Sequence, residues 1–382
     1  MRFADIPGIP ELKRKLAETV DQGHIAHAQL FAGAEGGVGL MLALAYAQYV
    51  NCEAPSEKDS CGVCPSCIKT SKFIHPDLHF CMPIAKVKKE EDKKETKVQL
   101  TPLLPAFRLF LHETPFGSLW DWSEAAEFEN RTPGINILSV RETIIGLQLK
   151  PYEGRFKIQL IWLPETMRTE GANAFLKILE EPPPYTLFLL VSDQPEQLLP
   201  TIISRTQRVN IPKLDEESMA GFLVNRFQAD PEKAIQAAAL SDGSISLALR
   251  LLSETNEDYH QLFMDWQRAC FSANFAALLQ HTDQFQALGK EVQKNFLRYC
   301  LNQVRKALVL SQGAGSVLHM KEQERNDLSR LGKALSLRQV EVLLQQLNMA
   351  YFHINQNASS RMIFFDTSLA IAASFKKTSI PA

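Results

Sequence analysis

The sequence predicts an α/β core, with a parallel sheet flanked by helices, followed by a small helical domain and a longer all-helical domain. Three observations support this fold class. Short strands that are apolar throughout alternate with helices between residues 27 and 212, which is typical of a parallel sheet covered on both faces. A glycine-rich turn joins the first strand to the helix after it. Beyond Pro212 the apolar residues follow helical spacing only.

The first elements lie before the first cysteine. Leu12–Gly23 has apolar residues near helical spacing and ends at a glycine, so we expect a helix there. The stretch HAQLFAG, His27–Gly33, predicts a buried strand, and LMLALAYAQYV, Leu40–Val50, predicts a helix. Between them lies the glycine-rich turn Gly33–Gly39. A strand, a glycine-rich turn and a helix in this order are the arrangement that cradles a phosphate.

A second run of strands and helices begins near Ile135. It predicts strands over Phe156–Leu163 and Thr186–Ser192, and helices over Ser139–Leu149, Ala172–Glu181 and Leu198–Arg205. The prolines at positions 182, 183 and 184 end the second of these helices, because proline cannot continue the hydrogen-bond ladder.

The rest of the chain predicts helices alone. A small group is expected over Asp215–Phe227, Pro231–Leu240 and Ser244–Leu252, and a longer helical set follows from about Tyr259. Within that set Val340, Leu343, Leu344 and Leu347 stand at i, i+3, i+4 and i+7, which predicts one buried stripe. We therefore expect three domains, with boundaries at 1–212, 213–258 and 259–382.

Composition and charge exclude several classes of protein. Lys plus Arg is 41 and Asp plus Glu is 43, so the net charge is −2, which excludes a strongly basic coat for nucleic acid. The 45% hydrophobic and 22% charged residues exclude a wholly disordered chain. The sequence has no apolar run of about 18 residues, so no membrane span is expected. The N-terminus lacks an apolar core and a cleavage site, so we expect a cytoplasmic protein.

Four of the seven cysteines form a tight cluster. Cys52, Cys61, Cys64 and Cys67 have the spacing C-x8-C-x2-C-x2-C. A C-x-x-C turn points two thiolates at one ion, and four thiolates at about 2.3 Å satisfy a tetrahedral zinc with no vacant position. We therefore predict one structural zinc ion per chain, in a module over residues 52–67. An iron–sulfur cluster, and a set of unrelated buried or redox cysteines, are the alternatives.

The glycine-rich turn lacks the chemistry of a working phosphate loop. Such a loop needs a Lys for the β- and γ-phosphates and a Ser or Thr hydroxyl for Mg²⁺. Here Gly33, Gly36 and Gly39 are present, but Gly39 stands where the Lys would be and Leu40 where the hydroxyl would be. The alternative register places Leu40 and Met41 there. We expect no bound ATP or Mg²⁺ and no intrinsic ATPase activity; the other interpretation is that this turn was never a nucleotide site.

The strand over Phe156–Leu163 also lacks the two acidic residues that would hold Mg²⁺ and orient water at its end. Trp162 and Leu163 occupy these places, and Glu165 lies past the strand end. The combined loss of the Lys, the hydroxyl and both acids is difficult to reconcile with hydrolysis.

Two further features each have a structural and a functional interpretation. Ser204 and Arg205, in TIISRT, end the short helix after the last strand, and Arg205 either projects from the domain edge or forms a surface salt bridge. The run KVKKEEDKKETK, Lys86–Lys97, is either a solvated loop or a basic finger that touches DNA. Its interleaved acidic residues weaken the second interpretation.

Together these residues resemble the delta-prime family of clamp-loader subunits of bacterial DNA polymerase III, in the AAA+ superfamily. The motifs that carry the resemblance occur in family order over about Phe3 to Pro212: HAQLFAG, the degenerate glycine loop, the cysteine spacing, LKPYEGRFKIQLI, ANAFLKILEEPPP and LLPTIISRTQ. The resemblance is weaker in the helical regions, in GSISLALRLL and INQNASSRMIFF. Thr206 stands where the family has Cys, and the segment from Met82 to Thr132 matches no family element.

The resemblance implies an AAA+ core with a zinc module, a small helical lid and a C-terminal collar that joins other subunits in a hetero-pentamer. It implies that Arg205, with Ser204, acts as an arginine finger on ATP bound by a neighbouring subunit. The implied partners are gamma/tau and delta-type subunits, the sliding clamp and, through the complex, primed DNA. The chain would be a stator that hydrolyses no ATP, within a DNA-directed DNA polymerase holoenzyme.

Two rival functions stay open at this point. The related gamma and tau subunits share the zinc spacing but keep a Lys-Thr and an Asp-Glu pair, so an active ATPase of that kind would need an atypical loop here. A zinc-dependent nucleic-acid-binding protein would bind DNA on its own, with a steep dependence on salt.

Overall fold

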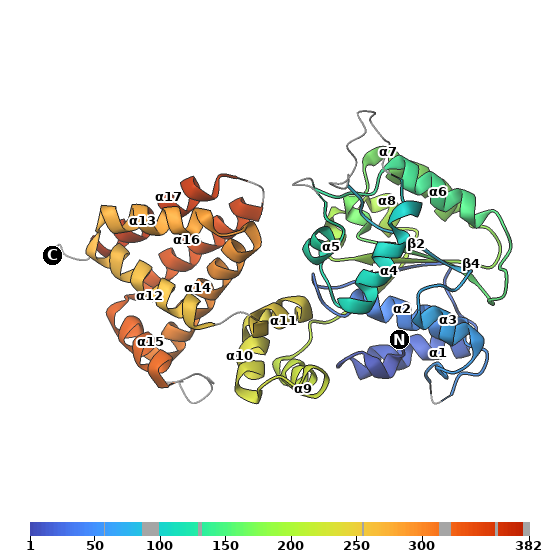
Figure 1. Ribbon diagram of the computed structural model, residues 1–382, viewed down its shortest axis with the longest axis horizontal. Coiled ribbons are helices and arrows are strands. Elements are labelled where there is room, and N and C mark those ends of the chain that lie inside the picture. Colours follow the sequence, from blue (N-terminus) through green and yellow to red (C-terminus); the bar gives the residue numbers. More distant parts are fainter. Residues whose placement is uncertain are drawn as a thin grey trace. The chain divides into compact units, whose positions relative to one another are not determined.

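The computed structural model describes residues 1–56, 58–85, 99–128, 132–253, 256–312, 322–355 and 358–376 (Figure 1). The chain forms two compact units: Met1–Ala234 with Ser241–Leu249, and Ile235–Leu240 with Arg250–Ala382. The three domain boundaries expected from the sequence remain a prediction. The charged run Lys86–Lys97 lies outside the described residues.

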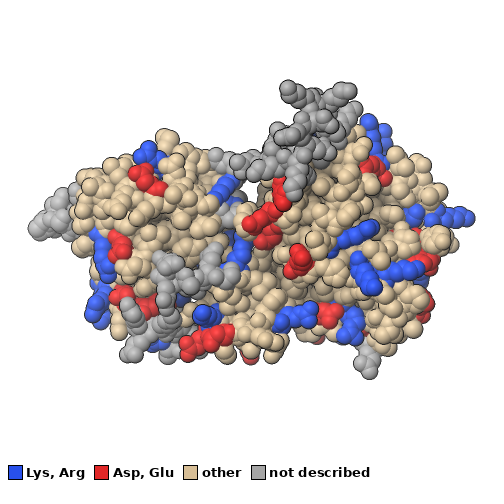
Figure 2. All heavy atoms as spheres, in the orientation of Figure 1, with Lys and Arg blue, Asp and Glu red and all other residues tan. Residues whose placement is uncertain are grey.

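Charged side chains of both signs lie interspersed on the face of the molecule drawn in Figure 2. This matches the near balance of 41 basic and 43 acidic residues in the sequence. Among the described residues, no helix is both long enough and apolar enough to cross a bilayer.

The first unit is built on a five-stranded parallel sheet with the strand order β2-β3-β4-β1-β5. The strands are β1 (Ala28–Ala32), β2 (Leu78–Cys81), β3 (Lys157–Trp162), β4 (Thr186–Ser192) and β5 (Gln207–Asn210). Every residue of β1, β3 and β4 is buried, as expected for central strands covered on both faces. The predicted α/β core with a parallel sheet is confirmed.

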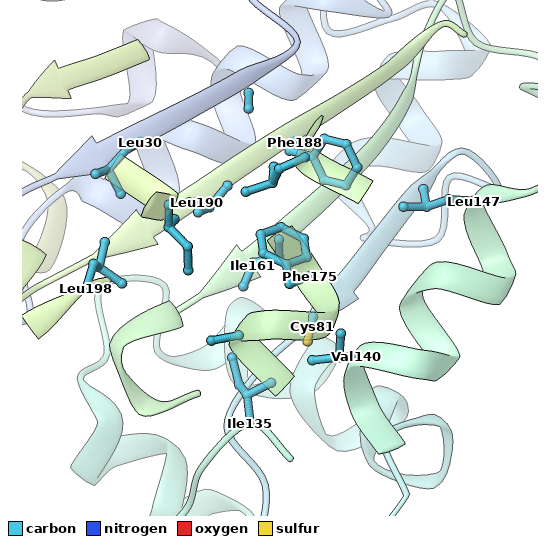
Figure 3. Close-up of a cluster of buried hydrophobic side chains, with 14 of the residues drawn as sticks. Leu30, Cys81, Ile135, Val140, Leu147, Ile161, Phe175, Phe188, Leu190 and Leu198 are labelled. Atoms are coloured by element: carbon cyan, nitrogen blue, oxygen red, sulfur yellow. The ribbon is translucent and has the colours of Figure 1, made fainter. Parts of the chain in front are cut away.

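Helices cover both faces of this sheet (Figure 1). They are α1 (Pro10–Asp21), α2 (Gly39–Val50), α3 (Pro65–Ser71), α6 (Ile137–Leu147), α7 (Thr169–Glu180) and α8 (Pro200–Ile203), with 3-10 turns at Phe3–Asp5, Pro164–Thr166 and Pro195–Gln197. Phe188 of β4 packs against Phe175 of α7 with ring centroids 5.7 Å apart, and Leu30 of β1 and Val140 of α6 belong to the same buried cluster (Figure 3). This buried cluster fixes α6 and α7 on one face, while α2 contacts β1, β3 and β4.

An insertion between β2 and β3 carries a 3-10 turn (Thr101–Leu103) and two helices, α4 (Leu104–Glu113) and α5 (Leu119–Ala125). It lies in the segment that matched no family element. Phe107 and Phe110 of α4 lie 5.1 and 5.4 Å from Trp122 of α5, and 5.6 and 5.8 Å from Trp162 at the end of β3, measured between ring centroids. These four aromatic side chains attach the insertion to the sheet.

Three helices follow the sheet: α9 (Glu216–Phe227), α10 (Pro231–Ser241) and α11 (Ile245–Ser253). They agree with the three predicted helices to within a few residues. Asp215 and Asp230 cap the first two, because each side chain accepts hydrogen bonds from the first turn of the helix it precedes. We call α9 to α11 the lid.

The described part of the second unit is helical. After segments of α10 and α11 it contains α12 (Asn256–Ser272), α13 (Phe275–Ala287), α14 (Lys290–Ser311), α15 (Glu322–Ala334), α16 (Leu337–Asn355) and α17 (Ser360–Lys376). Val340, Leu343 and Leu347 of the predicted stripe are buried, and Leu344 is partly buried. The rings of Phe285 and Phe364 stack with their centroids 4.1 Å apart. The predicted helical C-terminal region is thus confirmed.

Candidate functional site

The glycine-rich turn lies where the sequence predicted it, between β1 and α2. Gly39 begins α2, and Leu40 and Met41 are buried in the core. Neither register of the turn therefore presents a basic or hydroxyl side chain toward a phosphate. Gly36 has a φ of +65°, which favours glycine because other L residues are strained there.

The beginning of lid helix α11 lies against this turn. The Ser246 backbone N–H donates to the Gly36 carbonyl oxygen at 3.1 Å. A Cβ placed on Gly36 would lie 2.7 Å from Ser244 Oγ and 2.8 Å from Ser246 Cβ. The tip of the turn is therefore in van der Waals contact with the lid.

A serine–aspartate hydrogen bond extends this contact to the insertion. Ser246 Oγ donates to Asp121 Oδ2 of α5 at 2.6 Å, across a sequence separation of 125 residues. The same carboxylate caps α5, because it accepts hydrogen bonds from the Ser118 N–H at 2.6 Å and the Ser118 hydroxyl at 2.7 Å. The turn, the lid and the insertion thus meet at one point.

The end of β3 carries no acidic side chain, as the sequence indicated. Trp162 and Leu163 are 2% and 3% exposed. Glu165 lies in the turn after the strand, and its Oε1 accepts hydrogen bonds from the backbone N–H groups of Asp193 at 2.9 Å and Gln194 at 3.1 Å. Glu165 therefore holds the end of β4 in place.

Carboxyl groups gather at this edge of the sheet. Burial raises the pKa of Glu165 above its usual value. Burial of the Asp193 carboxyl group, together with the nearby carboxylates of Glu165 and Glu35, raises the pKa of Asp193 well above its usual value. This edge of the sheet thus has carboxyl groups with raised pKa values and no Lys of the kind that a working phosphate loop carries.

The structure brings the four predicted cysteines together. The Sγ atoms of Cys52, Cys61, Cys64 and Cys67 all lie within 4.8 Å of one another, and none of the four is in a disulfide. Gly62, with a φ of +75°, makes the turn between two of them. Cys64 caps α3, since its Sγ accepts from the Cys67 N–H at 3.4 Å. The predicted cluster thus has the compactness of a four-ligand metal site.

The donor chemistry of the cluster fits a cation. Backbone N–H groups of Val63 and Cys64 lower the pKa of the Cys61 thiol to about 6, which favours its thiolate. Burial raises the pKa of Cys52 and of Cys67. A bound cation would offset this cost, because metal ligation deprotonates thiols. Four thiolates this close together suit zinc or an iron–sulfur cluster.

Hydrogen bonds fasten this module to the start of β3. The Asn51 amide donates to the Phe156 carbonyl and accepts from the Phe156 N–H, both at 2.9 Å. A Cβ placed on Gly154 would lie only 2.7 Å from Asn51 Nδ2. Asn51, the residue before Cys52, therefore ties the beginning of the cysteine module to the start of β3.

A second attachment runs through the loop before β3. The Asp77 carboxylate accepts from the N–H groups of Tyr152, Glu153 and Gly154 at 2.6 to 2.8 Å. These three bonds lower the pKa of Asp77, although its burial acts in the opposite direction. Glu153 also forms an ion pair with Lys69 of α3 at 2.6 Å. The module is therefore attached to the sheet at two separate points.

Arg205 lies just after α8, at the edge of the first unit. Its Nη2 forms an ion pair with Glu180 Oε1 at the end of α7, at 2.7 Å. Its Nη1 donates to the Thr201 carbonyl at 3.0 Å and to Ser204 Oγ at 3.4 Å. The salt-bridge interpretation from the sequence describes this side chain, which is 35% exposed, and the role of Arg205 as a finger stays a prediction.

Three of these residues were not anticipated from the sequence: Asp121, Ser246 and Glu180. Ser118 and Asp121 form a capping box, which the S-x-x-D spacing could have revealed. The bond between Asp121 and Ser246 has no signal in the sequence, because it joins elements far apart in the chain. Glu180 lies in the motif LKILEEPPP, but its pairing with Arg205 depends on how α7 and α8 pack.

A comparison with protein families decides the family. The model described as "DNA polymerase III, delta subunit" matches residues 8–215, which is more than half of the chain. The chain belongs to this family. The members of the DNA polymerase III delta-subunit family are AAA+ clamp-loader subunits, and the resemblance stated from the motifs is confirmed at that level.

Individual relatives include two kinds of subunit. The chain is 27% identical over 259 residues to DNA polymerase III subunit tau of Salmonella typhimurium, covering 66% of this chain and 33% of that protein. It is 26% identical over 249 residues to subunit delta' of Haemophilus influenzae, covering 65% and 62%. It is 29% identical over 228 residues to subunit delta' of Pseudomonas aeruginosa, covering 59% and 56%. The chain thus spans about a third of the length of the tau relatives.

Proposed function

We propose that the chain is a delta-prime-like subunit of the DNA polymerase III clamp loader. It hydrolyses no ATP itself and supplies Arg205 to ATP on a neighbouring subunit while the sliding clamp is loaded on primed DNA. Its partners would be gamma/tau and delta-type subunits in a hetero-pentamer. Sequence identity favours neither kind of subunit, because it is 27% to tau and 26% to 29% to delta'. The choice of a delta-prime-like over a gamma/tau-like subunit therefore rests on the glycine-rich turn, which lacks the Lys and the hydroxyl of an active ATPase.

The turn supports a subunit without its own ATPase activity. It presents no Lys and no hydroxyl at Gly39 and Leu40, and the end of β3 is Trp162 and Leu163 instead of two acids. Its tip contacts Ser246 of the lid. A hydrolysing subunit needs a positively charged cradle and a bound Mg²⁺ at this place. A gamma/tau-like active ATPase is therefore the weaker alternative.

The surroundings of Arg205 support its role as a finger. Its ion pair with Glu180 is partly exposed, with 35% and 50% of the two side chains accessible, so the pair contributes at most about 1 kcal/mol. Phosphate oxygens of a neighbour's nucleotide could displace such a weak partner. An arginine supplied in trans neutralises developing phosphoryl charge and is worth roughly 10³ to 10⁵ in rate.

The other parts of the chain complete the proposal. Residues 1–212 would form the AAA+ core with a zinc module, 213–258 the lid and 259–382 the collar that joins neighbouring subunits. The cysteine cluster would hold one structural zinc ion. A zinc-dependent nucleic-acid-binding protein gains no support, because both charge signs are mixed on the face in Figure 2 and the net charge is −2.

The test is ATP hydrolysis by a reconstituted loader in which only the ATPase subunit next to this chain is hydrolysis-competent. Arg205→Ala should lower its DNA-stimulated kcat by at least about 10³, with little change in KM, because the finger acts in the transition state. Arg208→Ala is the matched control, since Arg208 is an exposed arginine on β5 of the same edge region. Full activity of the Arg205→Ala complex, or ATP hydrolysis by the isolated chain, would contradict the proposal.

A further inference from the structure

The insertion at residues 99–128 lies close to the places that a nucleotide would occupy in a working phosphate loop. It touches the end of β3, the first residues of lid helix α11 and lid helix α9. The contact with α11 is a hydrogen bond, and the contacts with β3 and α9 are aromatic.

The contact with α11 is polar. Asp121 Oδ2 accepts three hydrogen bonds, two from Ser118 and one from Ser246 Oγ, at 2.6 to 2.7 Å. Ser246 is 4% exposed, and its backbone N–H donates to Gly36. A charge-assisted bond of this length, here partly buried, is among the stronger hydrogen bonds in a protein. One residue of the lid therefore binds the turn with its backbone and the insertion with its side chain.

The contact with the sheet is aromatic. Trp162 stands where a hydrolase has an acid, and its ring packs on Phe107 and Phe110 of α4. Trp122, the residue after Asp121, packs on the same two phenylalanines and donates from Nε1 to the Pro83 carbonyl at 2.8 Å. Asp121 therefore lies on a helix, α5, that is fixed to the core through the adjacent residue Trp122.

The contact with α9 adds a second point on the lid. Phe116, in the turn before α5, is 5% exposed, and its ring meets Phe222 edge to face at 5.5 Å between centroids. The insertion therefore contacts the lid at two places, on α9 and on α11. Two separated contacts resist rotation of the lid, which one contact would not.

We propose that the insertion replaces a bound nucleotide as the ligand that joins core and lid. In a nucleotide-binding domain, the phosphates contact the glycine-rich turn and the elements around it, so binding selects one arrangement. Here Asp121 supplies an anion from within the chain, and Ser246 links it to the turn. Core and lid keep one arrangement whether or not MgATP is present. This inference does not depend on the arginine finger.

Hydrogen exchange of backbone amides in the full chain tests the proposal. Wild-type protein should exchange slowly in three segments, 33–39, 118–122 and 244–247, and MgATP should leave all three rates unchanged. Ser246→Ala removes the bond to Asp121 and should speed exchange at least about tenfold in all three segments. Exchange in β1 should stay slow, which shows that the sheet remains folded.

Two further variants sharpen the test. Ser123→Ala is the matched control, because Ser123 Oγ donates to the Leu119 carbonyl within α5 and touches no other element through that bond. It should leave the three segments unchanged. Gly36→Ala pushes the lid away from the turn and should speed exchange at 118–122, although Gly36 lies outside α5.

Two results would overturn the proposal. One is faster exchange confined to 244–247 in Ser246→Ala, because the turn and the insertion would then not be coupled to the lid. The other is slower exchange at 33–39 when MgATP is added to the wild-type chain, because a nucleotide would then bind the turn itself.

Discussion

Asp193 is the residue whose burial has the clearest electrostatic consequence for stability. It follows β4, and burial together with Glu165 and Glu35 raises its pKa well above the usual value. A carboxyl group whose pKa is raised by folding binds its proton more tightly in the folded chain than in the unfolded chain. The free energy of unfolding therefore falls as the pH rises from about 4 toward the raised pKa.

Asp193→Asn should consequently stabilise the protein at high pH. The amide is neutral at every pH, so the variant avoids the cost of a charged side chain next to two carboxylates. We expect a higher Tm than wild type at pH 8 and a smaller difference at pH 5, where more of the wild-type Asp193 is protonated. Thermal unfolding of both proteins at the two pH values measures this. A difference that grows toward low pH would show that the sign is wrong.

At the scale of elements, β3 and the insertion depend on each other through Trp162. Replacing a buried tryptophan with alanine removes its contacts and leaves a cavity, which costs about 3 to 5 kcal/mol. Trp162→Ala should lower the free energy of unfolding by this amount in a denaturant titration. Trp162→Phe keeps an aromatic ring against Phe107 and Phe110 and should lose clearly less. Equal losses in the two variants would mean that the ring contacts contribute little.

The central elements could be predicted from the sequence, and the edges could not. β1, β3 and β4 are mostly apolar because both faces of each strand are covered, and this pattern is local. β2 has four residues, and β5, Gln207–Asn210, has a single buried residue, so neither gives a strand pattern. The helices α4 and α5 were missed because their role depends on aromatic contacts with a strand that follows later in the chain.

The candidate site also has features that could be predicted from the sequence and features that could not. The four cysteines were predicted because they lie within 16 residues and their spacing alone specifies a cluster. The absence of the Lys and of the two acids could also be recognised from the sequence, because the positions that they would occupy are at fixed distances from a glycine or from a strand end. The pairing of Arg205 with Glu180, and of Asp121 with Ser246, depends on tertiary packing, for which a single sequence has no signal.

At the scale of the whole molecule, the cysteine module is the part whose folding would depend on a bound metal ion. If it holds zinc, elemental analysis should find one zinc ion per chain. Removal of the metal by a chelator, or Cys64→Ser, should lower the Tm by about 5 °C or more, because the site contributes to folding.

Cys300→Ala is the control for this measurement. Cys300 is buried in α14, far along the chain from the cluster, and should leave the metal content unchanged. If the purified protein contains iron and sulfide, the cluster holds an iron–sulfur centre and not zinc. If the metal-free chain has the same Tm as the wild type, the assignment of a structural metal is wrong.

Asn51 and Gly154 meet across the boundary between the cysteine module and the sheet. The asparagine binds both polar groups of the Phe156 backbone, and its amide leaves no room for a side chain at position 154. A lineage that acquired a larger residue at 154 would have to give up the asparagine as well. Evolution is therefore expected to retain the two positions together or to change them together, as a single inherited trait.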